Sequence, residues 1–176
     1  ITNITPNHLL EHTDFEEYSA TKASLLKYQK KDQWSVLNWD DPESKKLIER
    51  DDGETFPFSI REILPKGVFL EFGELRLKHG EKTETVMHSR EFPLLGDHNL
   101  SNALAAVAAA YLAKVPLESI ATTLRSVQPI PQRMELIGTS NGVEFYNDTA
   151  STAPESTIAA LKTLFSSDKK LILVMG

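Results

Sequence analysis

The first third of the chain alternates short apolar runs with one helical pattern. Residues 1–5 are mostly β-branched and precede Pro6, so they predict a buried strand that ends in a loop. Thr13-Asp14-Phe15-Glu16 fits a capping box, in which the Thr13 hydroxyl and the Glu16 carboxylate bind free backbone amides at a helix start. We therefore expect a helix from Asp14 to about residue 29.

Strand patterns follow this helix. Trp34–Asn38 predicts a strand, and the turn-forming residues after it lead into a short charged helix over 43–49. Between residues 55 and 93 apolar positions recur every second residue, which predicts antiparallel strands at 67–72 and 74–78.

An alanine-rich segment then predicts helix again. Residues 98–113 are composed largely of the best helix former, and Leu117–Ser126 predicts a second helix directly after Pro116. Because alanine side chains are small, the first of these helices can lie close to a sheet.

The last part of the chain predicts a separate domain. Pro129-Ile130-Pro131 interrupts the pattern, and Asn141-Gly142 joins two apolar runs as a hairpin turn. A capped helix over 154–165 and an apolar strand over 170–175, covered by helices on both faces, complete the pattern. We expect an α/β fold with domains at 1–130 and 131–176, cut from a longer polypeptide.

Composition removes several classes of function. The 176 residues carry 19 Lys and Arg against 25 Asp and Glu, a net charge of −6, so no basic surface is expected for nucleic acid or anionic membranes. The absence of cysteine excludes disulfides, thiolate metal sites and cysteine nucleophiles. The longest apolar run, 103–113, is shorter than the roughly 20 residues of a membrane span. We expect a cytoplasmic protein with no nucleic-acid or membrane partner.

The segment His8-Leu9-Leu10-Glu11-His12 matches an inverted zinc-protease motif. That motif requires a helix, whereas Pro6 and the predicted cap at Thr13 place both histidines in a loop. Solvated loop histidines are the simpler interpretation.

Lys22 falls within the apolar stripe of the first predicted helix, which consists of Phe15, Tyr18, Leu25 and Leu26. Its ammonium can extend past Tyr18 and Leu26 to solvent, as long side chains commonly do. Alternatively, conversion to a carbamate would make it an anionic oxygen ligand for magnesium. The residues alone leave both interpretations open.

Two further pairs have side chains suited to a nucleotide. Asn99 and Asn102 lie three residues apart on one helix face, and their amides could bind the edge of adenine, although Asp97 and Asn99 could equally cap the helix. The guanidinium of Arg133 suits phosphate and the carboxylate of Asp148 suits a ribose, although a surface ion pair explains these two residues equally well.

The order of these motifs resembles the Mur ligases, the ATP-dependent enzymes that add amino acids to the peptidoglycan precursor, and within them the members that add D-glutamate. The likeness spans nearly the whole chain and is carried by five stretches: Ile1–Leu9, Tyr18–Lys22, Leu95–Ala103, Pro131–Glu135 and Asn147–Thr149. The resemblance implies the later part of a central ATP-binding domain, with a mostly parallel sheet and a small antiparallel sheet, followed by the start of a Rossmann-like domain.

The resemblance also implies roles for single residues. Lys22, carbamylated, and His8 would be catalytic residues and would hold magnesium. Asn99, Asn102, Arg133 and Asp148 would form the ATP site, and Thr149 and Thr152 would lie at the substrate site. The implied cofactors are ATP and Mg²⁺, and the implied substrates are UDP-N-acetylmuramoyl-L-alanine and D-glutamate, which would be joined through an acyl phosphate.

Several positions depart from the family pattern. Asn7 stands in place of an aspartate, Leu10 and Glu11 in place of an aspartate and an arginine, Gln132 in place of a histidine, and Ala150 in place of a lysine near the substrate. No Gly-Lys-Thr phosphate loop occurs in the 176 residues, so the chain alone is not expected to turn over ATP. The alternatives are another ligase of the superfamily, such as one acting on folate, and a nucleotide-binding subunit without catalysis.

Overall fold

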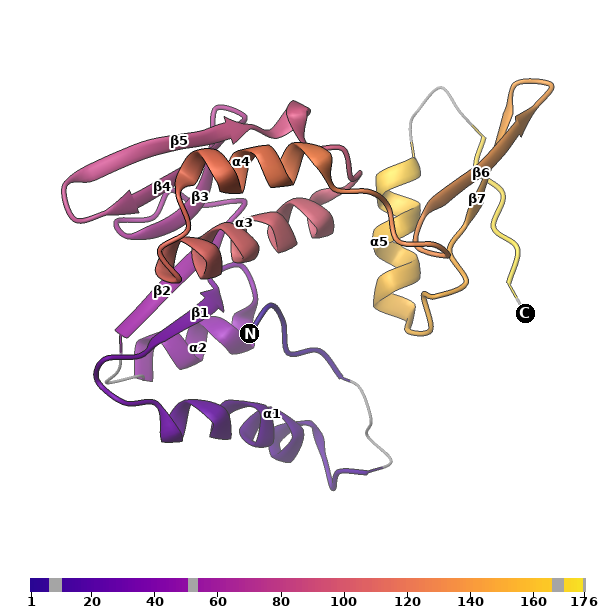
Figure 1. Ribbon diagram of the computed structural model, residues 1–176. Helices are drawn as coiled ribbons and strands as arrows, with labels where there is room; N and C mark the ends of the chain where they lie inside the picture. Colours follow the sequence, from indigo (N-terminus) through magenta and orange to yellow (C-terminus); the bar gives the residue numbers. More distant parts are fainter. Residues whose placement is uncertain (7–10, 51–53, 166–169, 176) are drawn as a thin grey trace.

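The computed structural model describes residues 1–6, 11–50, 54–165 and 170–175 (Figure 1). The elements are α1 (Phe15–Ala23), η1 (Ser24–Tyr28), β1 (Trp34–Asn38), α2 (Pro42–Arg50), β2 (Glu54–Ser59), β3 (Gly67–Glu71), β4 (Glu74–His79), β5 (Lys82–His88), η2 (Ser89–Glu91), α3 (Asp97–Leu112), α4 (Leu117–Ser126), β6 (Glu135–Ser140), β7 (Val143–Asn147) and α5 (Pro154–Leu164). This confirms the expected α/β class. None of the helices in the described ranges is long and apolar enough to cross a membrane.

The larger sheet has five strands in the order β1-β2-β3-β4-β5. β1, β2 and β3 are parallel, whereas β3, β4 and β5 are antiparallel, so the antiparallel strands continue the parallel sheet. The predicted antiparallel strands are confirmed as β3 and β4, whereas β2 pairs in parallel with β3. Four consecutive residues of β2 are buried, as expected of a strand that is covered on both faces.

The expected strand over residues 1–5 does not form, and only Ile1 makes backbone hydrogen bonds to β1. The Ile1 amine donates to the Val36 carbonyl at 2.7 Å, and the Asn38 N–H donates to the Ile1 carbonyl at 3.2 Å. The chain then leaves the sheet, because the Ile4 N–H donates instead to the carboxylate of Asp41 at 3.3 Å.

α3 is the helix on which the core is built. Its buried residues are Ala103, Leu104, Val107 and Ala108, and they pack against β1, β2 and β3. Small alanine side chains on this face bring the helix axis close to the sheet. α4 packs on both α3 and β5 and buries Ile120, Ala121 and Leu124.

The start of α1 differs from the expected capping box by one residue. Asp14, rather than Thr13, is the N-cap and accepts from the Glu17 N–H at 2.8 Å. The Glu17 carboxylate in turn accepts from the Thr13 N–H at 2.6 Å, so Glu17 takes the part that was expected of Glu16. The α-helix ends at Ala23 and continues only as the 3₁₀ helix η1.

The second sheet is the predicted hairpin of β6 and β7. Its turn residues Asn141 and Gly142 both have positive φ, 50° and 79°, as a type I′ turn requires. α5 begins with Pro154 in its first turn, and its N-cap, Ala153, makes no side-chain hydrogen bond. The prediction of a helix is confirmed, and that of a side-chain cap is wrong.

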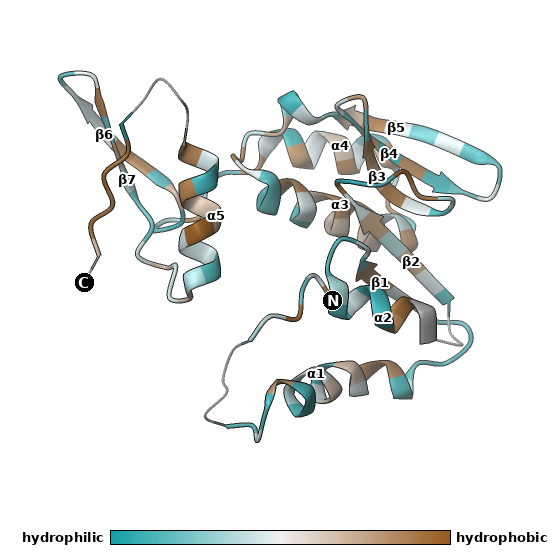
Figure 2. Ribbon diagram, turned by 180° about the vertical axis from the view of Figure 1, so that it is seen from behind, coloured by the Kyte–Doolittle hydropathy of each residue, from teal (hydrophilic) through white to brown (hydrophobic). Residues whose placement is uncertain are grey.

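Residues 170–175 form no strand, and every one of them is exposed. The expectation of a strand buried on both faces is wrong: Ile172 is 85% and Val174 is 89% exposed. Figure 2 shows this apolar segment beside β6 and β7. No strand within the described residues pairs with it, so its apolar side chains have no sheet to enter.

Gly67 provides a test of the parallel pairing of β2 and β3. Its φ is +123°, and a side-chain carbon there would lie 2.0 Å from the Pro57 carbonyl oxygen. We expect Gly67→Ala to lower the free energy of unfolding by about 3 kcal/mol or more, because strain and overlap act together.

Gly80→Ala is the matched control, since Gly80 also has positive φ but has open space around it. It should lower the free energy of unfolding by about 1 kcal/mol, because only the strain of a positive φ in a non-glycine residue applies there. Urea unfolding monitored by circular dichroism measures both variants. Equal losses for the two variants would contradict the close approach of β2 and β3.

Candidate functional site

The start of α3 is shaped by Gly96, whose φ of 92° no other residue adopts easily. Gly96 is the N-cap and its carbonyl accepts from the Asn99 and Leu100 N–H groups, each at 3.1 Å. Neither Asp97 nor Asn99 is therefore the capping residue. The Asn99 side chain instead donates to the Leu95 carbonyl at 2.8 Å, which fixes the loop before the helix.

Asn102 lies one turn further along α3 and is exposed. Its amide makes no hydrogen bond to any other described residue, so both its donor and its acceptor are available. Of the two asparagines, only Asn102 is free to bind a ligand.

The loop around Arg133 is strained. Gln132 and Met134, on either side of Arg133, have φ of 65° and 45°, a region that costs a non-glycine residue about 1–2 kcal/mol. Two hydrogen bonds hold Gln132: its N–H donates to the Glu135 carboxylate at 2.8 Å, and its carbonyl accepts from the Ala150 N–H at 3.0 Å. Strain held in this way is typical of functional loops.

Asp148 follows β7 and is fixed by the same loop. Its Oδ1 accepts from the Met134 N–H at 2.9 Å. The ion pairs among the described residues do not include Arg133 with Asp148, so the surface ion-pair interpretation is wrong. Arg133 is exposed, and its guanidinium is available to an anion.

His98, at the start of α3, lies within reach of the charges of Arg133 and Asp148. Its ring is partly buried, and burial lowers its pKa, while the nearby carboxylates of Asp148 and Asp97 oppose that shift and the Arg133 guanidinium adds to it. His98 belongs to α3, whereas Arg133 and Asp148 belong to the second sheet and its loops. The structure thus brings the start of α3 next to the Arg133 loop.

The two predicted substrate residues lie in the segment after β7. The Thr149 hydroxyl donates to Asn147 Oδ1 at 2.9 Å, and its N–H donates to the same oxygen at 3.2 Å. Thr152 is exposed in the loop before α5. The two hydrogen bonds to Asn147 thus order Thr149, whereas Thr152 is exposed to solvent.

Lys22 lies in the last turn of α1 and is exposed. Its ammonium lies 5.4 Å from the centroid of the Tyr18 ring. The expectation that Lys22 belongs to an apolar stripe is wrong, because the helix narrows to 3₁₀ at Ser24 and Leu25 is 71% exposed. The geometry matches an ammonium that extends past Tyr18 to solvent.

The predicted metal partner, His8, lies outside the described residues. His12, the second histidine of that motif, has its ring edge-on to Tyr18 at 5.3 Å and its Nδ1 3.8 Å from the Glu17 carboxylate. Within the described ranges, no three His, Asp or Glu side chains are grouped to hold a metal ion. In Figure 1, α1 with Lys22 lies well apart from the start of α3 and from α5.

Three residue positions important to this geometry were not predicted as functional. His98 lies within the Leu95–Ala103 stretch that carries the family resemblance, so the sequence indicated its importance without indicating its role. The positive φ of Gln132 and Met134 had no such signal, because neither residue type favours that region.

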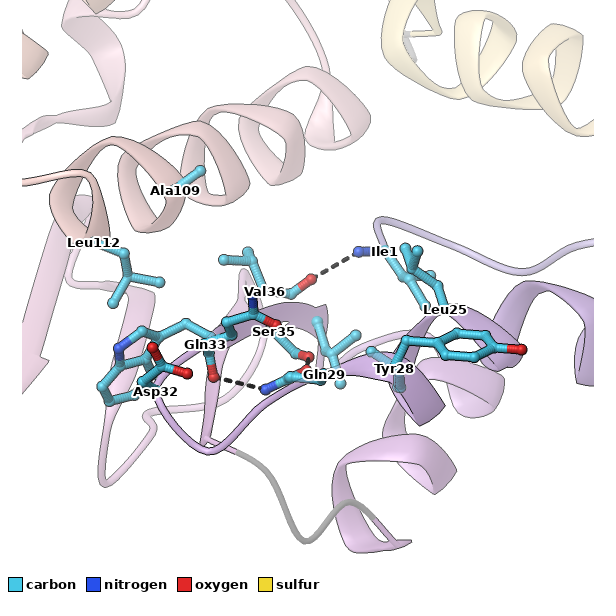
Figure 3. A pocket seen from close by; sticks show the side chains of 13 residues that line it. Ile1, Leu25, Tyr28, Gln29, Asp32, Gln33, Ser35, Val36, Ala109 and Leu112 are labelled. Atoms are coloured by element: carbon cyan, nitrogen blue, oxygen red, sulfur yellow. Dashed lines mark hydrogen bonds between the residues drawn. The ribbon is translucent and has the colours of Figure 1, made fainter.

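A cavity of about 680 Å³ lies elsewhere, along the outer edge of β1 between η1 and the C-terminal half of α3. Figure 3 shows its lining, which includes Leu25, Tyr28, Val36 and Leu112, with Ile1 bonded to Val36 at one end. It contains none of the predicted site residues. Of the candidate nucleotide residues, Asn102 and Arg133 are exposed, and Asn99 and Asp148 are partly buried.

Comparison with known proteins decides the family. Residues 1–110 match the family model described as the Mur ligase middle domain. The chain belongs to the Mur ligase family. The resemblance inferred from the five sequence stretches is thereby confirmed.

The curated relatives are longer proteins. The chain is 37% identical over 176 residues to the UDP-N-acetylmuramoylalanine--D-glutamate ligases of Thermoanaerobacter sp. (strain X514) and of Caldanaerobacter subterraneus subsp. tengcongensis. Each match covers 100% of this chain and 38% of the relative. The chain therefore spans well under half the length of these Mur ligases.

Solved structures of Mur ligases share the fold. MurF from Acinetobacter baumannii matches with a TM-score of 0.74 at 24% identity, over 93% of this chain and 36% of that chain. A pseudomurein peptide ligase type C from Methanothermus fervidus matches with a TM-score of 0.72 at 21% identity, over 97% of this chain and 41% of that chain. At these identities the likeness concerns the arrangement of helices and strands.

The burial of His98 has a measurable consequence. Because the folded chain holds its pKa below the ordinary value of about 6.5, the unfolded chain binds the proton more readily. The contribution of His98 to stability is thus complete above about pH 6.5 and is lost as the pH falls below that value. We expect His98→Gln to reduce the loss of unfolding free energy between pH 7.5 and pH 5.

Proton NMR of the imidazole over the same range gives the pKa directly. His79→Gln serves as the control, since His79 is an exposed histidine at the other end of α3. A His98 ring that titrates at or above the ordinary histidine value would contradict the burial of this side chain.

Proposed function

We propose that this chain is part of an ATP-dependent ligase that adds D-glutamate to UDP-N-acetylmuramoyl-L-alanine in peptidoglycan synthesis. The relatives at 37% identity bear the name of that activity, although the chain spans only 38% of their length. The observation that carries the proposal is the placing of Arg133 and Asp148, both available to a ligand, beside the start of α3.

The nucleotide is proposed to bind across these two groups. The free amide of Asn102 suits the edge of adenine, since it offers a donor and an acceptor side by side. The Met134 N–H occupies Oδ1 of Asp148, which fixes the carboxylate and leaves Oδ2 for a ribose hydroxyl. The guanidinium of Arg133 suits the phosphates.

The proposed reaction proceeds in two steps. The terminal carboxylate of the alanyl precursor attacks the γ-phosphorus of ATP, which forms an acyl phosphate and releases ADP. The amine of D-glutamate then attacks the acyl carbon, which forms the amide and releases phosphate. Negative charge gathers in both steps, so positive groups such as Arg133 stabilise them. Thr149 and Thr152 are proposed to contact the substrate.

The described residues do not by themselves form a magnesium site. The side chain of Lys22 ends in an ammonium, which is no ligand for a cation, and no suitable group of three carboxylates and imidazoles occurs among the described residues. Family resemblance still supports a carbamylated Lys22 together with His8 as the magnesium residues. We assign no step to the metal.

We further propose that residues 1–130 are the later part of the ATP-binding domain and that 131–176 begin a Rossmann-like ligase domain. The family match over 1–110 supports the first assignment. The use of ATP supports a cytoplasmic location. Without a Gly-Lys-Thr loop in its sequence, the chain alone should not hydrolyse ATP.

One observation favours a second candidate. Ala150 occupies the position where the family pattern has a lysine near the substrate, and only its N–H is bound, to the Gln132 carbonyl at 3.0 Å. A missing positive charge there fits a ligase with a different amino-acid substrate, or a nucleotide-binding subunit without catalysis.

A chimera tests the proposed activity. These 176 residues would replace the matching 38% of the Thermoanaerobacter ligase, which supplies the rest of the protein. We expect ADP release that depends on both D-glutamate and the alanyl precursor. Lys22→Ala should lower the rate by roughly a hundredfold or more, because the family resemblance makes Lys22, as a carbamate, one of the residues that would hold magnesium.

Lys27→Ala is the matched control, since Lys27 is an exposed lysine just beyond Lys22, in η1. Its activity should stay within about twofold of the parent. Addition of short carboxylic acids should restore part of the Lys22→Ala activity if the lysine acts as a carbamate. Full activity of Lys22→Ala without such acids would contradict its role, and ADP release without D-glutamate dependence would contradict the proposed reaction.

A further inference from the structure

Three consecutive N–H groups of the Arg133 loop bind acceptors within the protein. The Gln132 N–H donates to Glu135 Oε2 at 2.8 Å, and the Met134 N–H donates to Asp148 Oδ1 at 2.9 Å. Between them, the Arg133 N–H donates to the carbonyl three residues before it, at 3.1 Å. No backbone donor of these three residues is therefore left for a ligand.

Two carboxylates of the protein occupy donors that could otherwise bind an anion. Gln132 and Met134 have φ of 65° and 45°, and turns with such residues can direct neighbouring N–H groups at one bound anion. Here the carboxylates of Glu135 and Asp148 accept from those donors. A phosphate at this loop would therefore meet the exposed side chain of Arg133 and not the N–H groups.

Both carboxylates come from the same end of the β6–β7 hairpin. Glu135 is the first residue of β6 and pairs with Asn147, the last residue of β7, and Asp148 follows directly. Because this pairing fixes the backbone of Glu135, its carboxylate reaches the loop from a fixed base. The Ala150 N–H donates to the Gln132 carbonyl at 3.0 Å and binds the loop to the same end of the hairpin.

Glu135 differs from Asp148 in its role. Asp148 is proposed above to bind a ribose hydroxyl through Oδ2, so it contacts the nucleotide. The Glu135 carboxylate is partly buried, accepts from the Gln132 N–H and forms no ion pair with Arg133 among the described residues. All of these hydrogen bonds lie within residues 130–150, so the loop keeps its shape wherever this part of the chain lies relative to α3.

We propose that Glu135 is a positioning residue for Arg133. Its carboxylate holds Gln132 at positive φ, a conformation that is unfavourable for a residue with a side chain, and so sets the direction in which the Arg133 side chain leaves the loop. The Glu135–Gln132 bond needs no ligand, whereas its effect on ATP rests on the function proposed above. Two separate measurements therefore test the two parts.

The first measurement follows hydrogen exchange of the isotopically labelled 176-residue chain by NMR. Glu135→Met keeps a side chain of similar length but has no acceptor. It should speed exchange of the Gln132 N–H roughly tenfold or more, because a hydrogen bond to a charged acceptor is lost. Glu135→Gln keeps an oxygen acceptor and should change the rate by less than about threefold. Equal rates in Glu135→Met and in the parent would overturn the bond.

The Ser151 N–H serves as an internal control, since it donates to the Asp148 carbonyl at 2.9 Å and does not involve Glu135. Its exchange rate should be the same in all variants. If Glu135→Met speeds exchange at Ser151 as much as at Gln132, the residue supports the fold of the whole segment and the positioning role is wrong.

The second measurement uses the chimera with the Thermoanaerobacter ligase. Glu135→Met should weaken ADP binding and lower kcat/KM for ATP, each roughly tenfold, because a misdirected guanidinium no longer meets the phosphates. Glu135→Gln should keep both quantities within about threefold of the parent. Glu81→Ala removes an exposed carboxylate from the turn between β4 and β5, and as the control it should change neither quantity.

A double-variant cycle separates positioning from direct contact. In a chimera that already carries Arg133→Met, Glu135→Met should weaken ADP binding by less than about twofold further, because Glu135 acts on the nucleotide only through Arg133. The same loss of affinity in both backgrounds would mean that Glu135 acts on the nucleotide directly, and the positioning role would be wrong.

The outcomes distinguish this proposal from the function on which it rests. If the chimera binds ATP but Glu135→Met leaves the ADP affinity unchanged, the positioning role is wrong and the proposed function stands. If the chimera does not bind ATP, the proposed function is wrong, and the exchange rates still decide the Glu135–Gln132 bond. Should Glu135→Met fail to fold, Glu135→Ala provides the same tests, since it also lacks an acceptor.

Discussion

The close packing of α3 on the five-stranded sheet is the constraint on which the rest of this structure depends. Ala103 and Ala108 bring the helix near the sheet, while Leu104 and Val107 fill the space between β1, β2 and β3. Because the helix is fixed along its length, its first turn has a fixed position beyond the sheet. The packing of this core therefore holds the start of α3, which carries Asn99 and Asn102, in one position.

The proposed nucleotide site is formed by two segments that are distant in sequence. α3 offers the free amide of Asn102, and the strained loop around Arg133 offers a guanidinium and a carboxylate fixed by the Met134 N–H. The strain at Gln132 and Met134 is offset by hydrogen bonds to Glu135, Ala150 and Asp148. These residues make up the proposed nucleotide site, and Lys22 lies apart from them.

Local patterns predicted those elements whose own sequence decides their shape. The alanine-rich α3, the helix α4 and the Asn141-Gly142 turn formed as expected, since propensity and turn chemistry act within a few residues. The patterns failed where tertiary contacts determine the structure. The apolar segment 170–175 pairs with no strand among the described residues. The apolar stripe through Lys22 is interrupted because α1 gives way to the 3₁₀ helix η1. The hydrogen bond from Met134 to Asp148 could not be predicted, because the two residues are 14 positions apart.

The central claim is that α3 and the Arg133 loop form one nucleotide site. Titration of the isotopically labelled 176-residue chain with ATP, followed by NMR of the Asn102 side-chain amide and the Met134 and Ala150 backbone amides, tests it most directly. All three signals should shift together and give one dissociation constant. Shifts of Asn102 without those of Met134 and Ala150, or two different constants, would contradict a shared site.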